Sequence, residues 1–207
     1  MWFPILIGVL ISYSLGNLNG AVCISALMHD DVRSHGSGNA GLTNFVRSYG
    51  AGRALYVILI DAGKAVISCL LTGLLLKPYG CYLEGTALGG LAVMLGHTYP
   101  VFLGFRGGKG ILSGFFVALM VDWRVAVLIL LVFAVVYLLT QYVSLGSVLA
   151  ALAFSIGFAV AYYENLVVMI CGVLMGALAI FMHRSNISRL LQGKERKTNL
   201  FQKGKDA

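Results

Sequence analysis

Charged side chains are scarce in this sequence. Only 11% of its 207 residues are Asp, Glu, Lys or Arg, and 59% are hydrophobic. Soluble domains carry about 25% charged residues. A soluble chain of this length could bury a core, but it would still need polar side chains to cover its outside. The composition therefore excludes an ordinary soluble domain and predicts a surface that mostly faces lipid.

A basic nucleic-acid-binding face is also missing. The formal net charge is +7, but long stretches carry no charge, and the basic residues gather in three short segments and a tail. Nucleic-acid-binding proteins instead place Lys and Arg along a folded polar face. The pattern favours the positive-inside rule of membrane proteins, and we expect membrane lipid rather than nucleic acid as the surroundings.

The four cysteines have no Cys-x-x-Cys spacing, which argues against a disulfide framework or a zinc site. We expect them to be small buried apolar residues, and we expect neither a metal nor a cofactor. The N-terminus has no basic segment, because the first charged residue is Asp30. We therefore interpret residues 2–28 as a retained span rather than a cleaved signal peptide.

Several hydrophobic runs have the length of a membrane span, which is about 20 residues. The candidates are 2–28, 54–76, 85–105, 125–140, 145–161 and 166–182. A further run, 111–121, has only 11 residues and on length alone would be re-entrant or buried.

The distribution of positive charge indicates that 111–121 also crosses. With the N-terminus outside and seven crossings, twelve of the 15 Lys and Arg residues lie on the cytoplasmic side. Without this crossing the bias would largely vanish. The sequence thus predicts an all-α integral membrane protein with seven transmembrane helices, an outside N-terminus, a cytoplasmic C-terminus and one domain, 1–207. Glycine pairs four residues apart, such as Gly16/Gly20, Gly85/Gly89 and Gly172/Gly176, predict close helix packing within one chain. A dimer interface is the alternative, and we expect a monomer.

Three polar segments fall on the cytoplasmic side in this topology: 35–47, 96–110 and 183–189. Polar residues at a membrane are energetically expensive and are often functional. In the second segment, glycines around Lys109 can turn backbone N–H groups toward an anion, and a helix beginning there adds more of them. The alternative is a basic turn that only obeys the positive-inside rule. No Ser or Thr follows Lys109, so the segment is not a P-loop.

The first segment formally matches Gly-x-Gly-x-x-Gly, but a membrane span precedes it, and this excludes a Rossmann nucleotide site. Its hydrogen-bonding residues are Ser37, Asn39, Thr43, Asn44 and Arg47. In the third segment, Asn186 and Arg189 share a helix face. Asp61 and Lys64 can form an ion pair within a span, and this pair is either structural or functional. His97 and His183 are likewise each either a buried structural residue or a residue of the site. We expect most of the tail 193–207 to be a frayed end attracted to anionic lipid.

Two common catalytic signatures, His-x-x-x-x-Asp and Gly-x-Ser-x-Gly, are absent. The three segments, GSGNAGLTNFVR at 36–47, GHTYPVFLGFRGGKG at 96–110 and HRSNISRLLQGKE at 183–195, resemble the motifs of the bacterial acyl-phosphate:glycerol-3-phosphate acyltransferases of the PlsY type. The resemblance covers the whole chain. Departures are Leu42, Arg106, Ala65 and residues 111–113, which affect substrate detail more than the activity.

This resemblance implies transfer of a fatty acyl group from acyl phosphate to the 1-hydroxyl of glycerol 3-phosphate at the cytoplasmic side of the bacterial plasma (inner) membrane. The products are lysophosphatidic acid and phosphate. The expected catalytic residues are His97, Lys109 and His183. The expected phosphate-binding residues are Ser37, Gly38, Asn39, Thr43, Asn44, Arg47, Gly107, Gly108, Gly110, Asn186 and Arg189.

Three points stay open at this stage. The base is His97, His183 or a substrate phosphate oxygen. We expect Lys109 and the 107–110 backbone to hold one phosphate, and Ser37, Arg47, Asn186 and Arg189 to help hold the other. The competing classes are a small transporter with a cytoplasmic anion site and a membrane regulator that senses phosphorylated lipid, although no internal repeat of the kind seen in transporters is visible.

Overall fold

The computed structural model describes residues 1–198, and the elements within that range are helices. The α-helices are α1 (Trp2–Gly16), α2 (Gly20–Leu27), α3 (Leu42–Tyr49), α4 (Ala54–Leu76), α5 (Tyr82–Thr98), α6 (Ile111–Val121), α7 (Trp123–Thr140), α8 (Val143–Ala161), α9 (Leu166–Met182) and α10 (Arg184–Leu191). Short 3-10 turns are η1 (Val32–Ser34), η2 (Lys77–Tyr79) and η3 (Val101–Leu103). This confirms the all-α fold.

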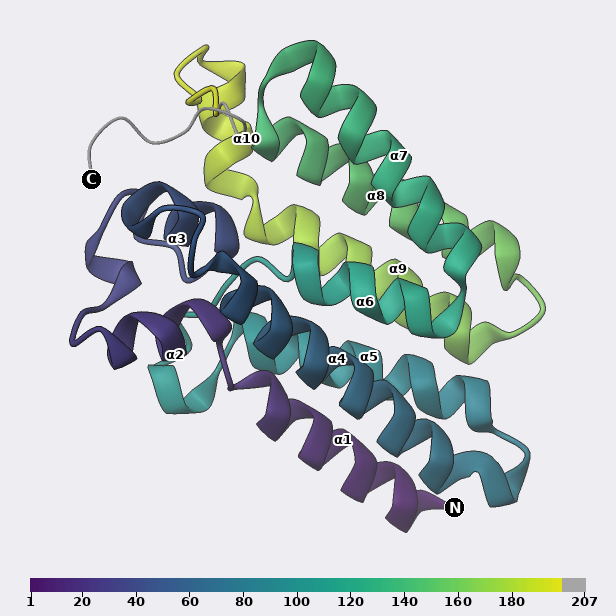
Figure 1. The fold of residues 1–207 in the computed structure, drawn as a ribbon. Coiled ribbons are helices and arrows are strands. Elements are labelled where there is room, and N and C mark those ends of the chain that lie inside the picture. The colour runs from purple at the N-terminus through teal and green to yellow at the C-terminus, as the bar shows by residue number, and fades with distance from the viewer. Residues whose placement is uncertain (199–207) are drawn as a thin grey trace.

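The long helices run side by side as a bundle (Figure 1). α5 packs against α1, α4 and α9, while α8 packs between α7 and α9. The main buried cluster joins these two groups through α6, with residues such as Met94, Val117, Phe154 and Met175. The outward faces carry large apolar side chains, among them Leu131 at 58% and Leu139 at 80% exposure. Such a surface suits lipid and not water.

Four helical stretches within the described residues are long and apolar enough to cross a membrane: 54–79, 82–103, 123–140 and 143–161. Two bent pairs, α1 with α2 at 43° and α9 with α10 at 55°, raise the number to six if each pair is one span. α6 is apolar but has only 11 residues. The protein is therefore a multi-pass membrane protein with four to six candidate spans, and the seventh crossing stays a prediction.

The expected continuous span 2–28 is interrupted between Gly16 and Gly20. A break leaves carbonyl groups without helical partners, and inside a membrane they need other donors. Lys64 Nζ donates to the carbonyl oxygens of Leu18 at 2.6 Å and Gly16 at 3.3 Å. The side chain of Asn19 caps α2 by accepting from the N–H of Val22 at 3.1 Å. The polar residues of this region therefore stabilise a bend that hydropathy alone did not reveal.

Glycines allow the close helix packing expected from their spacing. A Cβ on Gly16 would lie 2.8 Å from the Cα of Gly96, so α1 and α5 touch through their backbones. Similarly, a Cβ on Gly85 would lie 2.5 Å from the carbonyl oxygen of Thr72 on α4. The first contact lies beside His97 near the end of α5, and the second lies at the start of α5, so α1, α4 and α5 pack closely along the length of α5.

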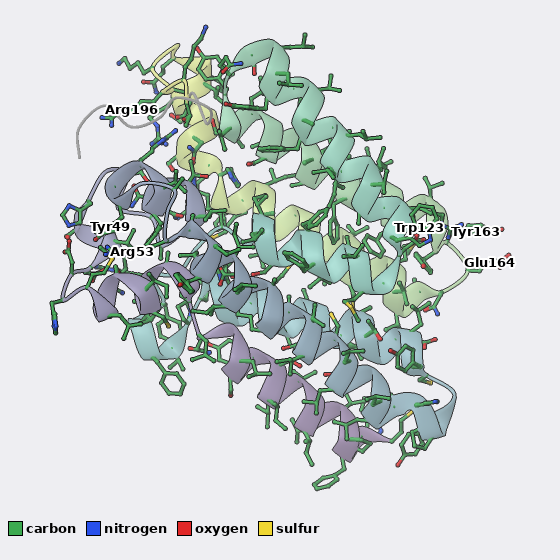
Figure 2. The ribbon with its side chains drawn as sticks, in the orientation of Figure 1. Tyr49, Arg53, Trp123, Tyr163, Glu164 and Arg196 are labelled. Atoms are coloured by element: carbon green, nitrogen blue, oxygen red, sulfur yellow. The ribbon has the colours of Figure 1, made fainter. Side chains whose placement is uncertain are left out.

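The two ends of the bundle differ in character. α2, α3 and α10 lie at the end opposite to the N-terminus (Figure 1). Figure 2 shows Tyr49, Arg53 and Arg196 toward that end, and Trp123, Tyr163 and Glu164 at the other. The three polar segments of the sequence therefore gather at one end of the bundle.

Candidate functional site

The loop before α6 has a set of backbone N–H groups without a protein acceptor. Gly110 has φ +78°, a left-handed conformation that favours glycine, and α6 begins at the next residue. The first intrahelical bond is the one from the N–H of Gly114 to the carbonyl of Gly110. Among the described residues, the N–H groups of Lys109 and 110–113 have no protein acceptor. A helix N-terminus of this kind binds anions.

Not every N–H group of this loop is available. The N–H of Gly108 donates to the carbonyl oxygen of His97 at 3.0 Å. A Cβ on Gly107 would lie 2.7 Å from the Cδ of Pro100, and one on Gly108 would lie 2.8 Å from the carbonyl oxygen of Ala40. The two glycines therefore let the loop fold tightly against the end of α5 and against the first motif, and Gly108 serves this packing.

Lys109 connects the second motif to the third. Its Nζ donates to the Oδ1 atom of Asn186 at 2.5 Å. Asn186 Nδ2 in turn donates to Glu195 at 2.8 Å, and Arg189 Nε donates to the other carboxylate oxygen of Glu195 at 2.7 Å. Asn186 is buried, and the Glu195 side chain is only 6% exposed. Two basic side chains, an amide and one carboxylate thus form a single network.

The charges in this network perturb one another. Burial lowers the pKa of Lys109 to about 8, although the Glu195 carboxylate acts in the opposite direction. Burial on its own raises the pKa of Glu195, but hydrogen bonds from Asn186 and Arg189 outweigh it, so this pKa lies below its ordinary value. The positive charges of Arg47 and Arg189 also lower the pKa of Lys109, because like charges repel. A bound anion would relieve this repulsion, so the cluster favours anion binding.

The first motif forms a loop organised by Asn44. Its Oδ1 accepts from the N–H of Ser37 at 2.9 Å, and its Nδ2 donates to the carbonyls of Val32 at 2.9 Å and His35 at 3.0 Å. Gly38 within the loop has φ +69°. The Asn44 amide is thus engaged within the protein and shapes the loop that presents Ser37.

The remaining residues of the first motif are more accessible. Ser37 and Gly38 are exposed, and Asn39 and Thr43 are half-buried near the start of α3. Arg47, on α3, donates to the hydroxyl of Thr198. The carbonyl of Thr198 accepts from Tyr137 at 2.9 Å.

The segment 195–198 therefore departs from the frayed end expected for the tail, because Glu195 and Thr198 bind residues of α3, α7 and α10. The rest of that tail, 199–207, lies outside the described residues. Neither residue was singled out from the sequence, although Glu195 ends the third motif and could have been noticed there.

The two histidines expected at the site have different surroundings. His97 is 4% exposed, and its Nδ1 lies 2.8 Å from Lys64 Nζ, which also pairs with Asp61 at 2.8 Å. The expected pair of Asp61 and Lys64 is thus confirmed. His183 is 3% exposed, at the junction of α9 and α10, and its Nδ1 lies 2.7 Å from the carbonyl oxygen of Ala179. Because a carbonyl only accepts, His183 carries a proton on Nδ1.

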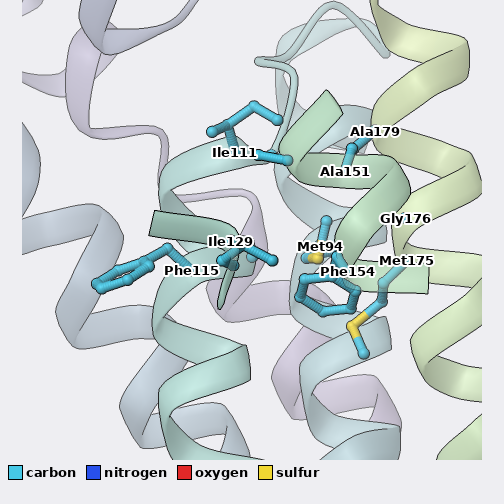
Figure 3. Close-up of a pocket in the computed structure, with 12 residues that line it drawn as sticks. Met94, Ile111, Phe115, Ile129, Ala151, Phe154, Met175, Gly176 and Ala179 are labelled. Atoms are coloured by element: carbon cyan, nitrogen blue, oxygen red, sulfur yellow. The ribbon is translucent and has the colours of Figure 1, made fainter. Parts of the chain in front are cut away.

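An apolar pocket begins directly beside the anion-binding loop (Figure 3). Its lining includes Gly110 and Ile111, which follow Lys109, and Ala179, which lies one turn before His183. Side chains of α5 to α9 complete it, among them Met94, Phe115, Phe154 and Met175. The loop that carries Lys109 therefore borders an apolar pocket of about 30 Å³ between the helices. Among the described residues, no group of three His, Cys, Asp or Glu side chains could hold a metal ion.

The structure thus brings the three motifs together around Lys109, with contributions from Arg47, Asn186 and Arg189. Lys109 and Asn186, which we expected to help hold different phosphates, are directly hydrogen-bonded, and their assignment to two phosphates stays a prediction. Among the described residues, Ser37, Asn39 and Thr43 make no side-chain hydrogen bond to this cluster.

Comparison with known proteins identifies the family of this chain. The family profile for "Glycerol-3-phosphate acyltransferase" matches residues 6–193. The glycerol-3-phosphate acyltransferase of Finegoldia magna is 39% identical over 94% of this chain and 96% of its own length. That of Aquifex aeolicus is 38% identical over 90% of this chain and 95% of its own.

Two solved structures of PlsY, an integral membrane glycerol 3-phosphate acyltransferase, are similar to this one. The glycerol 3-phosphate form has a TM-score of 0.86 and 37% identity, with 96% of this chain and 99% of the other covered. The lysophosphatidic acid form has a TM-score of 0.83 and 36% identity, with 95% and 96% covered. The chain therefore belongs to the PlsY family of membrane glycerol-3-phosphate acyltransferases, enzymes of phospholipid synthesis that produce lysophosphatidic acid.

Proposed function

We propose that the acyl donor is an acyl phosphate and that the acceptor is the 1-hydroxyl of glycerol 3-phosphate. The observation that carries this proposal is the contact between an anion-binding site and an apolar pocket at Lys109, Gly110 and Ile111. An acyl phosphate has the matching two parts, a charged head and a hydrocarbon chain. It is also an activated mixed anhydride, so that no nucleophile from the protein is required.

In the proposed reaction, the hydroxyl oxygen of glycerol 3-phosphate attacks the acyl carbon. The bond between this carbon and the phosphate oxygen breaks, and inorganic phosphate leaves. Lys109 and the free N–H groups at the start of α6 stabilise the negative charge that moves onto the departing phosphate. Arg47, Asn186 and Arg189 bind phosphate oxygens within the same cluster, and Ser37, Asn39 and Thr43 contribute hydroxyl or amide groups from the first motif.

The hydroxyl proton needs an acceptor. His183 offers one in its neutral form: since Nδ1–H donates to Ala179, the lone pair is on Nε2. A phosphate oxygen of the donor is the second acceptor, and in that case the proton leaves with the inorganic phosphate. Retention of most of kcat by His183→Asn would favour the phosphate oxygen, whereas a fall of about 100-fold or more would favour the histidine.

We further propose that the chain crosses the bacterial plasma membrane seven times, with the site on the cytoplasmic side. The four to six candidate spans and the short α6 add to seven when both bent pairs and α6 cross. The accumulation of basic residues at the end that carries the three motifs supports this orientation. A cysteine-accessibility experiment in intact cells, with a single reporter cysteine at Ser34 and another at Tyr163, would test it.

Purified full-length protein in lipid should release phosphate and form lysophosphatidate from palmitoyl phosphate and glycerol 3-phosphate. Turnover with palmitoyl-CoA alone would contradict the proposed donor. Lys109→Ala should abolish turnover while the protein still inserts, and Lys77→Ala at the other end of the bundle is the matched control. A fully active Lys109→Ala protein would remove Lys109 from the site.

A further inference from the structure

A buried polar cluster lies beneath the glycine loop, residues 107–110, which precedes α6. Lys64 Nζ on α4 has three acceptors within 2.8 Å: the Asp61 carboxylate at 2.8 Å, the Leu18 carbonyl at 2.6 Å and the Nδ1 atom of His97 at 2.8 Å. The Gly16 carbonyl lies farther away, at 3.3 Å. Asp61, Lys64 and His97 are 2%, 3% and 4% exposed. Asp61 also accepts from the N–H of Gly20 at 3.2 Å. Its members come from α4, α5 and the break between α1 and α2.

The cluster determines where His97 carries its proton. An ammonium group has three protons and no lone pair, so it can only donate. Opposite charges on Asp61 and Lys64 balance each other, which is the state that a buried pair requires. Because Lys64 donates to Nδ1, this nitrogen holds the lone pair, and the neutral ring of His97 has its proton on Nε2.

The other edge of the His97 ring contacts the glycine loop. A Cβ added to Gly108 would overlap Nε2, so the ring and the glycine are in direct contact. The N–H of the same glycine donates to the backbone carbonyl of His97 at 3.0 Å. His97 thus contacts Gly108 through both its side chain and its backbone, one residue before Lys109.

We propose that Asp61 and Lys64 are positioning residues for this loop: they hold His97 with its proton on Nε2 and its ring against Gly108, so that His97 shapes the phosphate site and is not the base. The inference rests on the proposed phosphate-binding role of the Lys109 loop. His183 provides the contrast, since its proton is on Nδ1 and its Nε2 lone pair is free of any hydrogen bond within the described residues.

The tautomer can be observed without any kinetic measurement. The full-length protein, labelled with ¹⁵N histidine and placed in lipid bilayers, should give for His97 a protonated Nε2 and a hydrogen-bond-accepting Nδ1 in solid-state NMR. His97→Asn identifies the signal among the four histidines. A proton on Nδ1, or a doubly protonated ring, would overturn the proposal.

The role of the charge pair is tested by removing both charges together. Asp61→Asn with Lys64→Met avoids a single unpaired buried charge. We expect the fixed tautomer to be lost and the KM for at least one phosphorylated substrate to rise about fivefold or more, equivalent to about 1 kcal/mol. An unchanged tautomer together with an unchanged KM would contradict the role of the pair. Size-exclusion elution and thermal melting verify that the double variant is folded.

A rescue experiment separates positioning from base catalysis. His97→Asn retains an acceptor for Lys64 near Nδ1 but cannot accept a proton from substrate, whereas His97→Ala retains neither. We expect His97→Ala to raise KM about tenfold and His97→Asn to recover a large part of this loss, but only when Lys64 is present. A base would contribute about 10²–10⁴-fold, so a loss of kcat of about 100-fold in His97→Asn and His97→Ala alike would refute the proposal.

The two proposals can fail separately. If the unmodified protein does not turn over palmitoyl phosphate, the proposed donor is wrong, and the NMR result still decides the state of His97. If turnover is normal but His97 shows a proton on Nδ1, the proposed function stands and the positioning role is refuted.

Discussion

The activity of this enzyme should decline at alkaline pH because of Lys109. Its pKa is lowered to about 8, first by burial. A lysine with that pKa is about 90% protonated at pH 7 and about 10% protonated at pH 9. Only the protonated form supplies a charge to a phosphate oxygen, so kcat/KM should fall about tenfold between these pH values.

Lys109→Arg is the matched variant, because arginine stays charged throughout this range. We expect it to have lower activity but no decline between pH 7 and pH 9. Glu195→Gln acts in the other direction: loss of the carboxylate that raises the pKa of Lys109 should move the decline to lower pH. The two variants therefore shift the same limb of the profile in opposite ways.

The assay is the initial rate of phosphate release at low substrate concentration, after subtraction of spontaneous hydrolysis. Substrate phosphates have a second pKa of about 6, so their charge is nearly constant above pH 7. An alkaline limb that persists unchanged in Lys109→Arg would refute the reasoning, since the titrating group would then be another residue.

Three further substitutions have clear expected outcomes. Gly108→Ala places a methyl group against His97, and such overpacking costs about 1–3 kcal/mol; phosphate release should fall about tenfold or more. Gly96→Ala overlaps the carbonyl oxygen of Tyr13 on α1 and should lower the melting temperature in detergent, whereas Gly63→Ala, with nothing within 4 Å, should not. Phe115→Ala enlarges the apolar pocket and should favour stearoyl over palmitoyl phosphate in direct competition. An unchanged ratio of the two products would show that the acyl chain does not bind in this pocket.

The convergence of the three motifs could be predicted because hydropathy and charge place them at the same end of the bundle. Lys109, Asn186 and Arg189 lie in one hydrogen-bond network at that end. The sequence pattern could not predict which side chains of the different motifs bind one another. A contact between Lys109 and Asn186 depends on the 55° bend between α9 and α10, and a bend leaves little trace in average hydrophobicity.

Two features were missed for related reasons. The break in the first span contains no proline and no charged residue that would mark it in the sequence. Its compensating donor, Lys64, lies 46 residues from Leu18 in the sequence. Glu195 stood in a polar segment that resembles an ordinary solvated tail. Its role depends on tertiary contacts with Asn186 and Arg189. Composition identifies a membrane protein, whereas such long-range partners appear only once the helices are packed.

The brevity of α6 has a consequence for how the donor reaches the site. With 11 residues, the helix rises only about 16 Å, roughly half the hydrocarbon thickness of a bilayer. In the proposed seven-span topology, so short a helix would leave Lys109 close to the hydrocarbon core. Extracting a 16-carbon chain into water would cost about 12 kcal/mol, at about 0.8 kcal/mol for each methylene. An acyl phosphate that diffuses in the plane of the membrane can avoid this barrier, because its phosphate meets Lys109 while its tail never leaves the hydrocarbon.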